Sequence, residues 1–315
     1  MTYIPLTHRP VFWDALIALL CIALVAWIAL SSTLFPAPAS GIGVALGVIG
    51  LAIVSYGSFI EPKRISLNTK SIQKSLPAMR IAVIGDLHVG PYKQSSFVEK
   101  IARNVNALDP DLIFIVGDFL FDHTSDIFHL DPLRELTSRY GTFGIIGNHD
   151  SGRHLRRGKH FVTRDRSDEV SAYLQERGVA MLRNKSHRLD INGTALRVAG
   201  IDDIWMSSSD LDAALNGIAN DEPTILLSHN PDVILDERSH HASLIISGHT
   251  HGGQIRLPFV GSLYPLPDRL GRAYDQGIFH ISDRTTLAIT HGIGETQTRA
   301  RLFCPPEILV LHIHP

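Results

Sequence analysis

The sequence predicts an α/β domain that follows a pair of apolar helices, and three observations predict it. Short apolar runs bounded by turn residues recur from residue 80 onward, which is typical of strands buried on both faces of a sheet. Amphipathic stretches with helical spacing separate these runs, as in α/β proteins. Only two of the 60 charged residues (29 basic and 31 acidic), Arg9 and Asp14, fall within residues 1–60.

The first 62 residues are expected to form a membrane anchor of two transmembrane helices. Residues 15–34 and 41–60 are uncharged runs of the length that crosses a bilayer as a helix. Basic residues lie outside the pair, so the positive-inside rule predicts a multi-pass protein of the cell inner membrane with the domain that follows on the cytoplasmic face. The alternative is a cleaved signal peptide ending near Ala39, after which residues 41–60 would remain as a span.

Residues 63–79 are expected to form a linker that includes at most one strand, and residues 80–315 one soluble domain. The pattern predicts strands at residues 80–84, 112–116, 142–146, 224–227 and 244–246. It predicts helices at residues 95–107, 167–177 and 210–218. Asn192-Gly193 predicts a two-residue hairpin between strands at 188–191 and 195–198. Strands at 286–290 and 307–314 are expected to add an antiparallel contribution.

Composition narrows the chemistry of the domain. The net charge of −2 excludes a protein that coats nucleic acid, because such a protein needs a basic surplus. Cys21 and Cys304 are the two cysteines, so a disulfide framework is excluded. Seventeen histidines direct any metal chemistry toward nitrogen and oxygen ligands.

Polar residues follow five of the predicted strands, at the positions where open α/β sheets place their ligands. A single Asp-x-His or Gly-Asn-His-Asp segment is an ordinary turn. Five strand ends that share such residues instead predict a metal site. Oxygen and imidazole ligands suit Mn²⁺, Fe²⁺ or Zn²⁺. The residues are Asp86, His88, Asp118, Asn148, His149, Asp150, His229, His249 and His251.

These residues resemble the signature of the calcineurin-like metallophosphoesterases. The matching motifs are Asp86-x-His88, Gly117-Asp118, Gly147-Asn148-His149-Asp150, His229 and Gly248-His249-Thr250-His251. Residues 248–254 and 305–308 are similar to a bacterial membrane-associated branch, which includes UDP-2,3-diacylglucosamine pyrophosphatases. The resemblance implies a sandwich of two mixed sheets flanked by helices.

The resemblance also implies two divalent metal ions, with Mn²⁺ favoured and Fe²⁺ or Zn²⁺ as alternatives. By it, Asp86, His88 and His251 hold the first metal, and Asp118 bridges both. The second metal is held by Asn148, His229 and His249. His149 is expected near the leaving oxygen as an acid or transition-state stabiliser, oriented by Asp150 or another carboxylate. One departure is His291, where relatives more often carry an arginine.

A basic segment at residues 151–166 follows the Asn148 turn directly. It contains one acid, Asp165, and six basic residues. One interpretation is a solvated charge run. The other is anion binding, to a substrate pyrophosphate or to lipid head groups of the inner leaflet. The candidate substrate-binding residues in it are Arg153, Arg156, Arg157 and Lys159.

Together these features predict a membrane-anchored two-metal hydrolase of a phosphodiester or pyrophosphate. Its expected partners are the membrane and a phosphate-containing, lipid-linked substrate such as UDP-2,3-diacylglucosamine, with no nucleic acid. One alternative is a tethered phosphodiesterase or phosphatase of broad specificity. Another is an inactive metal-binding regulatory module, which the complete ligand set disfavours.

Overall fold

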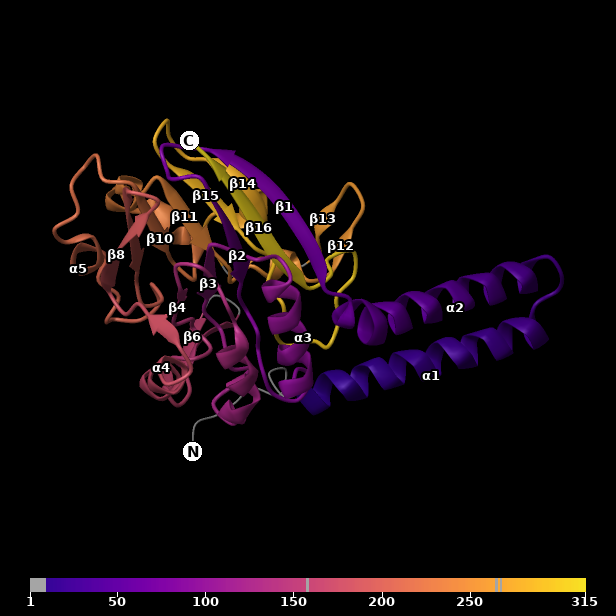
Figure 1. Ribbon diagram of the computed structural model, residues 1–315. Helices are drawn as coiled ribbons and strands as arrows, with labels where there is room; N and C mark the ends of the chain where they lie inside the picture. Colours follow the sequence, from indigo (N-terminus) through magenta and orange to yellow (C-terminus); the bar gives the residue numbers. More distant parts are fainter. Residues whose placement is uncertain (1–9, 157–158, 264–265, 267) are drawn as a thin grey trace.

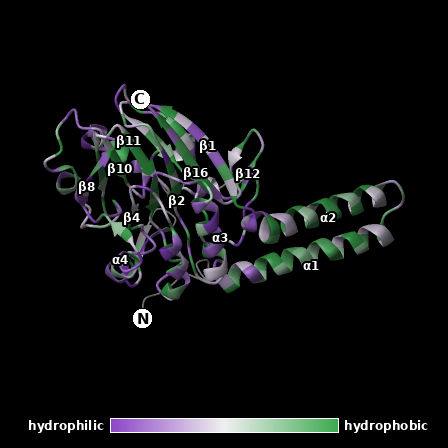
Figure 2. Cartoon of the chain, viewed as in Figure 1, coloured by the Kyte–Doolittle hydropathy of each residue, from purple (hydrophilic) through white to green (hydrophobic). Residues whose placement is uncertain are grey.

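The computed structural model describes residues 10–156, 159–263, 266 and 268–315, and it consists of a long helix pair that extends from an α/β domain (Figure 1). Helix α1 spans Pro10–Leu34 and α2 spans Ala39–Ser55, continuing through short π and 3₁₀ turns at Tyr56–Ile60 and Glu61–Lys63. Both helices are apolar along their length (Figure 2), and each is long enough to cross a membrane.

Small residues allow the two apolar helices to pack closely. A Cβ added at Gly43 would lie 2.7 Å from Ser31 Oγ, and one at Gly47 would lie 2.5 Å from Ile28 Cγ1. The indole nitrogen of Trp27 donates a 2.9 Å hydrogen bond to the carbonyl of Gly43. A glycine pair four residues apart at a close helix contact is typical of membrane helices.

The first sheet has the strand order β1-β16-β2-β3-β4-β7. All neighbours are parallel except β16 and β2, which are antiparallel. Strand β1, within the segment expected as a linker, pairs along its whole length with β16 and is therefore part of the sheet. The strands are β1 Ser66–Gln73, β2 Met79–Ile84, β3 Leu112–Val116, β4 Thr142–Ile145, β7 Val179–Met181 and β16 Glu307–His314.

The second sheet has the order β14-β15-β11-β10-β9-β8, with antiparallel pairs at both edges. The predicted hairpin through Asn192-Gly193 is confirmed as β8–β9. The strands are β8 Lys185–Ile191, β9 Thr194–Gly200, β10 Thr224–Leu227, β11 Leu244–Ser247, β14 Gly277–His280 and β15 Thr286–Ile289.

The main core lies between the two sheets. Buried side chains from the first sheet, such as Phe114 and Leu311, form one cluster with Leu227 and Ile246 of the second. Helices α3 (Ser95–Asn106) and α4 (Ser167–Gln175) contribute to a second cluster, on the other face of the first sheet. A third cluster joins the second sheet to α5 (Leu211–Leu215), which is shorter than predicted. The predicted two-sheet sandwich flanked by helices is confirmed.

Two small hairpins were not predicted, because their strands are too short or too polar to give a periodic signal. Strands β5 (Arg153–Arg156) and β6 (Lys159–Val162) follow the Asn148 turn. Strands β12 (Arg256–Leu257) and β13 (Gly261–Ser262) follow the His249–His251 segment. The remaining elements are α5 Leu211–Leu215 and 3₁₀ segments at Ile127–Glu135, Pro231–Leu235, Glu237–His241, His251–Gly253 and Gly271–Tyr274.

The helix pair is attached to the domain by polar contacts at its base. The hydroxyl of Tyr92 lies 3.3 Å from Asp14 Oδ1. The backbone N–H of Arg301 donates to the carbonyl of Gly57 at 2.9 Å. The N–H of Cys304 donates to a carboxylate oxygen of Glu61 at 2.6 Å. The C-terminal loop before β16 therefore lies directly against the end of α2.

Candidate metal centre

The predicted metal ligands come together in the turns after β2, β3, β4, β10 and β11. All seven are buried, with between 0% and 6% of each residue exposed. Five of them have a left-handed backbone: Asp86, His88, Asp118, His249 and His251 have φ between 45° and 70°. Such conformations are uncommon outside glycine and cluster at functional sites, where the surrounding structure maintains them.

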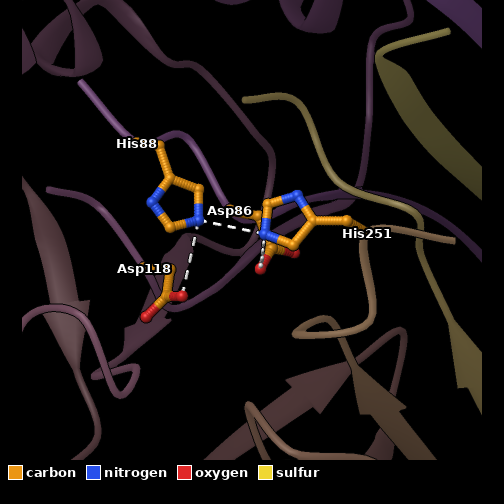
Figure 3. Close-up of side chains that lie close together, drawn as sticks. All are labelled: Asp86, His88, Asp118 and His251. Carbon is orange, nitrogen blue, oxygen red and sulfur yellow. Dashed lines mark hydrogen bonds and ion pairs between the residues drawn. The ribbon is translucent and has the colours of Figure 1, made fainter. Parts of the chain in front are cut away.

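The first group of donors consists of Asp86, His88, Asp118 and His251, whose ligand atoms all lie within 4.8 Å of one another (Figure 3). His88 Nε2 lies 3.0 Å from His251 Nε2 and 3.5 Å from Asp118 Oδ2. His251 Nε2 lies 3.5 Å from Asp86 Oδ1. Side chains from three different turns thus point at one position.

The second group consists of Asn148, His229 and His249, and it adjoins the first at Asp118. His249 Nδ1 lies 2.9 Å from Asn148 Oδ1 and 3.2 Å from His229 Nε2. His229 Nε2 lies 3.1 Å from Asn148 Oδ1 and 3.3 Å from Asp118 Oδ2. Asp118 Oδ2 is therefore close to one imidazole of each group, at the position that a bridging ligand requires.

The spacing of the donors fits divalent cations. Ligand atoms held about 2.1 Å from one ion stand roughly 3.0–3.4 Å apart in octahedral or tetrahedral geometry. The hydrogen-bond and ion-pair separations in the two groups are 2.9–3.5 Å, close to this range, and all ligand atoms of the first group lie within 4.8 Å of one another. The donors are carboxylate, amide oxygen and imidazole nitrogen, which suit Mn²⁺, Fe²⁺ or Zn²⁺.

Burial prepares three of the imidazoles for metal binding, because a ligand imidazole must be neutral. Burial lowers the pKa of His88 to about 3, helped by His149 nearby. Burial likewise holds the pKa values of His249 and His251 well below the usual histidine range. All three rings are neutral at physiological pH.

The pKa values of Asp86, Asp118 and His229 are shifted in the directions that favour a protonated Asp86, an ionised Asp118 and a protonated His229. Burial raises the pKa of Asp86 to about 7. Burial alone would also raise the pKa of Asp118, but His229 and His149 hold it well below its usual range. Burial would lower the pKa of His229, yet Asp118 raises it to about 10. The proton on His229 balances Asp118, and a divalent cation would replace it.

Main-chain groups fix the orientation of several ligands. His229 Nδ1 donates to the carbonyl of Val116 at 2.7 Å, which leaves Nε2 facing the site. The amide nitrogen of Asn148 donates to the carbonyl of Arg153 at 2.7 Å, which turns its oxygen toward His229 and His249. Such outer contacts set which atom of a ligand faces a metal.

His149 lies at the rim of the first group, half-buried, with its ring 4.5 Å from the ring of His88. The expectation that Asp150 orients it is wrong. Asp150 is buried and turned away, accepting hydrogen bonds from the N–H groups of Leu120 and Gly147. His149 Nδ1 instead lies 2.6 Å from the carbonyl of Phe121.

The basic segment forms the β5–β6 hairpin beside the site. The carbonyl of Arg153 holds Asn148, so its main chain has a positioning role. Arg166 is buried and pairs with Glu169 at 2.6 Å, which shows a structural role for that member. Arg157 lies outside the described residues, as do the side chains of Arg156 and Lys159.

Several neighbours of the site gave a weak sequence signal or none. The ring of Trp205 lies 4.8 Å from that of His249. Asp203 is buried nearby, and burial raises its pKa to about 6. The ring of His154 lies 4.7 Å from that of His149, and Thr296 Oγ1 lies 3.5 Å from His149 Nε2. Their positions depend on the paths of loops and short hairpins, which short-range patterns do not predict.

His291 lies behind the first donor group and not at the mouth of the site. Its Nε2 lies 3.1 Å from Glu307 Oε2, and both side chains are buried. Burial alone would lower the pKa of His291, but hydrogen bonds to Cys304 and Glu307 raise it to about 9. His291 thus forms a buried ion pair with Glu307, and its ring is held between Glu307 and Cys304.

The family model and the sequence relatives that match this chain point to one protein family. A family model described as calcineurin-like phosphoesterase matches residues 79–253. The uncharacterized metallophosphoesterase YkuE of Bacillus subtilis is 28% identical over 266 residues, which cover 81% of this chain and 87% of YkuE. The transmembrane protein with metallophosphoesterase domain of Bos taurus is 29% identical over 301 residues. That match covers 89% of this chain and 63% of the bovine protein.

The phosphopantetheinyl hydrolase of Mycobacterium tuberculosis is among the similar solved structures. It matches with a TM-score of 0.42 and 14% sequence identity, over 68% of this chain and 89% of that one. This chain spans less than two thirds of the length of the bovine relative.

Proposed function

The chain belongs to the calcineurin-like phosphoesterase family, and we propose that it is a membrane-anchored two-metal hydrolase of a phosphodiester or pyrophosphate. The observation that carries the proposal is the position of Asp118. Its Oδ2 lies 3.5 Å from His88 Nε2 in one donor group and 3.3 Å from His229 Nε2 in the other. A carboxylate shared by two such groups suits a pair of divalent cations, with Mn²⁺ favoured.

Each group of donors has a defined part in this proposal. Asp86, His88 and His251 hold the first ion. Asn148, His229 and His249 hold the second, and Asp118 bridges both. When bound, the two ions supply Lewis-acid stabilisation of the attacking and leaving oxygens of an in-line displacement.

His149 is the proposed acid or transition-state stabiliser beside the leaving oxygen. Its Nδ1 donates to the carbonyl of Phe121, which leaves Nε2 on the side of Thr296 at the mouth of the site. A neutral Nε2 accepts a proton, and a protonated one delivers it, so the ring can serve a leaving oxygen within hydrogen-bond reach. The contact with Phe121 keeps the ring in one orientation through that transfer.

The proposed substrate is a phosphodiester or pyrophosphate carried by a lipid. The two apolar helices would span the inner membrane, and the basic residues at their ends favour a cytoplasmic active domain. An anchor of this kind raises the effective concentration of the site toward lipid-linked molecules. UDP-2,3-diacylglucosamine, cleaved to its lipid monophosphate and UMP, is the concrete candidate. Arg153, Arg156, Arg157 and Lys159 are proposed to bind its second phosphate.

Full-length protein in lipid nanodiscs, stripped of metal and reloaded with Mn²⁺, tests the proposal. We expect hydrolysis of soluble bis(p-nitrophenyl) phosphate and release of UMP from UDP-2,3-diacylglucosamine in the same discs. His149→Asn is the matched control, because it should keep both metals and lose turnover. Good turnover of the soluble diester alone would favour a tethered enzyme of broad specificity. If the protein with two metals bound hydrolyses neither substrate, the result would indicate an inactive regulatory module.

A separate experiment tests the proposed role of the β5–β6 hairpin in substrate binding. Replacing Arg156 and Arg157 with glutamine should raise KM for the lipid substrate several-fold while sparing the soluble diester, because binding is lost without any change to the metals. Equal losses on both substrates would mean that the segment supports the fold.

A further inference from the structure

The β12–β13 hairpin carries an exposed apolar tip. Phe259 is fully exposed, and Val260 at its side is 60% exposed. Leu257 and Leu263 on either side are 41% and 45% exposed, and Phe303 in the neighbouring loop is 59% exposed. Clustered exposed apolar side chains mark an interaction surface, whereas isolated ones are ordinary.

This surface lies beside the base of the apolar helix pair. The N–H of Arg256 in β12 donates to the carbonyl of Leu302 at 2.9 Å. The side chain of Leu302 in turn lies 3.8 Å from a Cβ built at Gly57, in the turn that ends α2. Figure 1 shows β12–β13 projecting from the domain on the side where the helix pair leaves it. Leu302 therefore links the hairpin to the end of α2.

The hairpin is also fixed to the metal site. The ligand His251 begins the 3₁₀ segment His251–Gly253, and β12 follows three residues later. Gly253 lies so close to β13 that an added Cβ would stand 1.9 Å from Ser262 Oγ. The His251 turn and β13 are therefore in close contact.

An open depression with basic and apolar side chains lies along the hairpin. A depression of about 510 Å³ is lined by Arg256, Arg272 and Asp275 together with Phe259 and Phe303. Arg256 pairs with Asp275 and donates to the carbonyl of Gly252 at 2.7 Å, so its guanidinium is held in place. Basic groups below an apolar tip match the layering of a bilayer surface, with phosphates outside the acyl chains.

We propose that the β12–β13 hairpin is a second membrane contact, in which Phe259 and Val260 enter the acyl boundary of the leaflet and the exposed Arg272 meets the lipid phosphates. This inference rests on the proposed function, because it takes the helix pair to span the membrane. The occupant is phospholipid because the hairpin is linked through Leu302 to the end of α2, and α1 and α2 are themselves exposed and apolar. The contact holds the His251 turn at the bilayer surface.

Lipid contact is measured with a fluorophore at the tip. Phe259→Cys in a Cys21→Ala background is labelled with an NBD dye, and the full-length protein is placed in nanodiscs containing a lipid-borne nitroxide quencher. The control is Phe128→Cys, since Phe128 is another exposed phenylalanine (63% exposed) and lies on the 3₁₀ segment packed against α3, away from the hairpin. The unsubstituted background reports any labelling of the buried Cys304.

We expect at least twofold quenching and a blue-shifted emission at position 259, and water-like emission at position 128. Equal, water-like emission at both positions would overturn the proposal. Strong quenching at both would also overturn it, because the contact would then not belong to the hairpin.

A second variant separates this inference from the proposed function. Phe259→Asp should reduce release of UMP from a lipid nucleotide in the bilayer by about tenfold, with hydrolysis of bis(p-nitrophenyl) phosphate unchanged. Quenching at position 259 without any turnover of the lipid nucleotide would contradict the proposed lipid substrate, and the proposed membrane contact would still hold. If Phe259→Asp does not change turnover of the lipid nucleotide and the emission at position 259 is water-like, the membrane contact is contradicted and the proposed lipid substrate still holds.

Discussion

The side-chain amide of Asn148 donates a 2.7 Å hydrogen bond to the carbonyl oxygen of Arg153, and this bond decides which end of the amide faces the metal site. Only the nitrogen end of the Asn148 amide can donate to a carbonyl, so Oδ1 is left facing the site, 2.9 Å from His249 Nδ1. The β5–β6 hairpin thus begins by fixing a ligand. An asparagine here supplies an oxygen without adding negative charge opposite an anionic substrate.

Asn148→Ala should remove one metal and leave the other. The change deletes the oxygen of the second donor group but touches none of Asp86, His88 and His251. Asn148→Asp keeps an oxygen ligand but places a second oxygen against the Arg153 carbonyl, and we expect a loss of metal affinity of about 10–100-fold. Metal content by mass spectrometry checks both variants. Two tightly bound ions in Asn148→Ala would contradict the assignment.

Asp118→Asn should cost more activity than a change at His88 or His249, because it weakens both donor groups together. We expect the metal content to fall from two toward one or zero and kcat/KM to fall by more than about 100-fold. His88→Asn and His249→Asn, measured in parallel, are the controls. Two bound ions and normal turnover in Asp118→Asn would show that this carboxylate does not bridge.

Gly253→Ala should destabilise the protein through steric overlap. The new Cβ would meet Ser262 Oγ at 1.9 Å, and φ at this residue is 76°. Gly193→Ala is the matched control, with φ of 85° and open space around it. The control should lose about 1–2 kcal/mol from the left-handed backbone alone. The overlap should add about 1–3 kcal/mol to the loss in Gly253→Ala. Urea unfolding of the full chain in detergent measures both, and equal losses would contradict the close approach.

Glu307→Gln should weaken the fold behind the metal site, because it leaves the buried imidazole of His291 without its anionic partner. Removing one partner of a buried pair costs about 3–5 kcal/mol. The pKa of His291 is raised from 6.5 to about 9, so its contribution is complete below pH 6.5 and is lost as pH rises to about 9. Burial would raise the pKa of Glu307, but His291 lowers it below 4.5, so its contribution is lost in acid.

The midpoint of thermal unfolding, measured from about pH 5 to 10, tests whether the His291–Glu307 pair stabilises the fold. Wild-type Tm should decline between about pH 6.5 and 9, and the decline should be smaller in Glu307→Gln. Parallel curves for the two proteins would show that the pair does not contribute.

A reporter fused after Pro315 should lie in the cytoplasm. Basic residues flank both ends of the helix pair, and the turn between the helices has none. Alkaline phosphatase fused there should be inactive and green fluorescent protein fluorescent. The reverse pattern would overturn the membrane hairpin and the inner-leaflet substrate together.

Most of the sandwich could be predicted from sequence because its strands are buried on both faces. Strand β3, for example, is five apolar residues followed by Gly117-Asp118, and a short apolar run of this kind is typical of a strand that is buried on both faces. The donor groups could be predicted for the same reason, since each ligand follows such a strand. Strand β1 was harder, because it is mostly exposed and is defined by pairing with residues 240 positions away.

The contacts of His149, the proposed catalytic histidine, could not be predicted. Asp150 follows His149 directly, which made it the obvious orienting partner, but its carboxylate is used by the N–H groups of Leu120 and Gly147. The actual partner, the carbonyl of Phe121, is a main-chain atom that every residue possesses. Sequence identifies reactive side chains, whereas the backbone atoms that orient them depend on the path of the loops.

The pairing of β1 with β16 sets the order in which the protein can be completed during synthesis. Ser66 leaves the ribosome with the helix pair, but its partner at Pro306 is made 240 residues later. At translation rates of about 5–20 residues per second, that interval is roughly 12–48 s. Throughout it, the helices can enter the membrane while β1 and β2 still lack the strand that joins them. With the proposed anchor in place, the nascent chain would therefore be held at the bilayer before the first sheet of its domain can be completed.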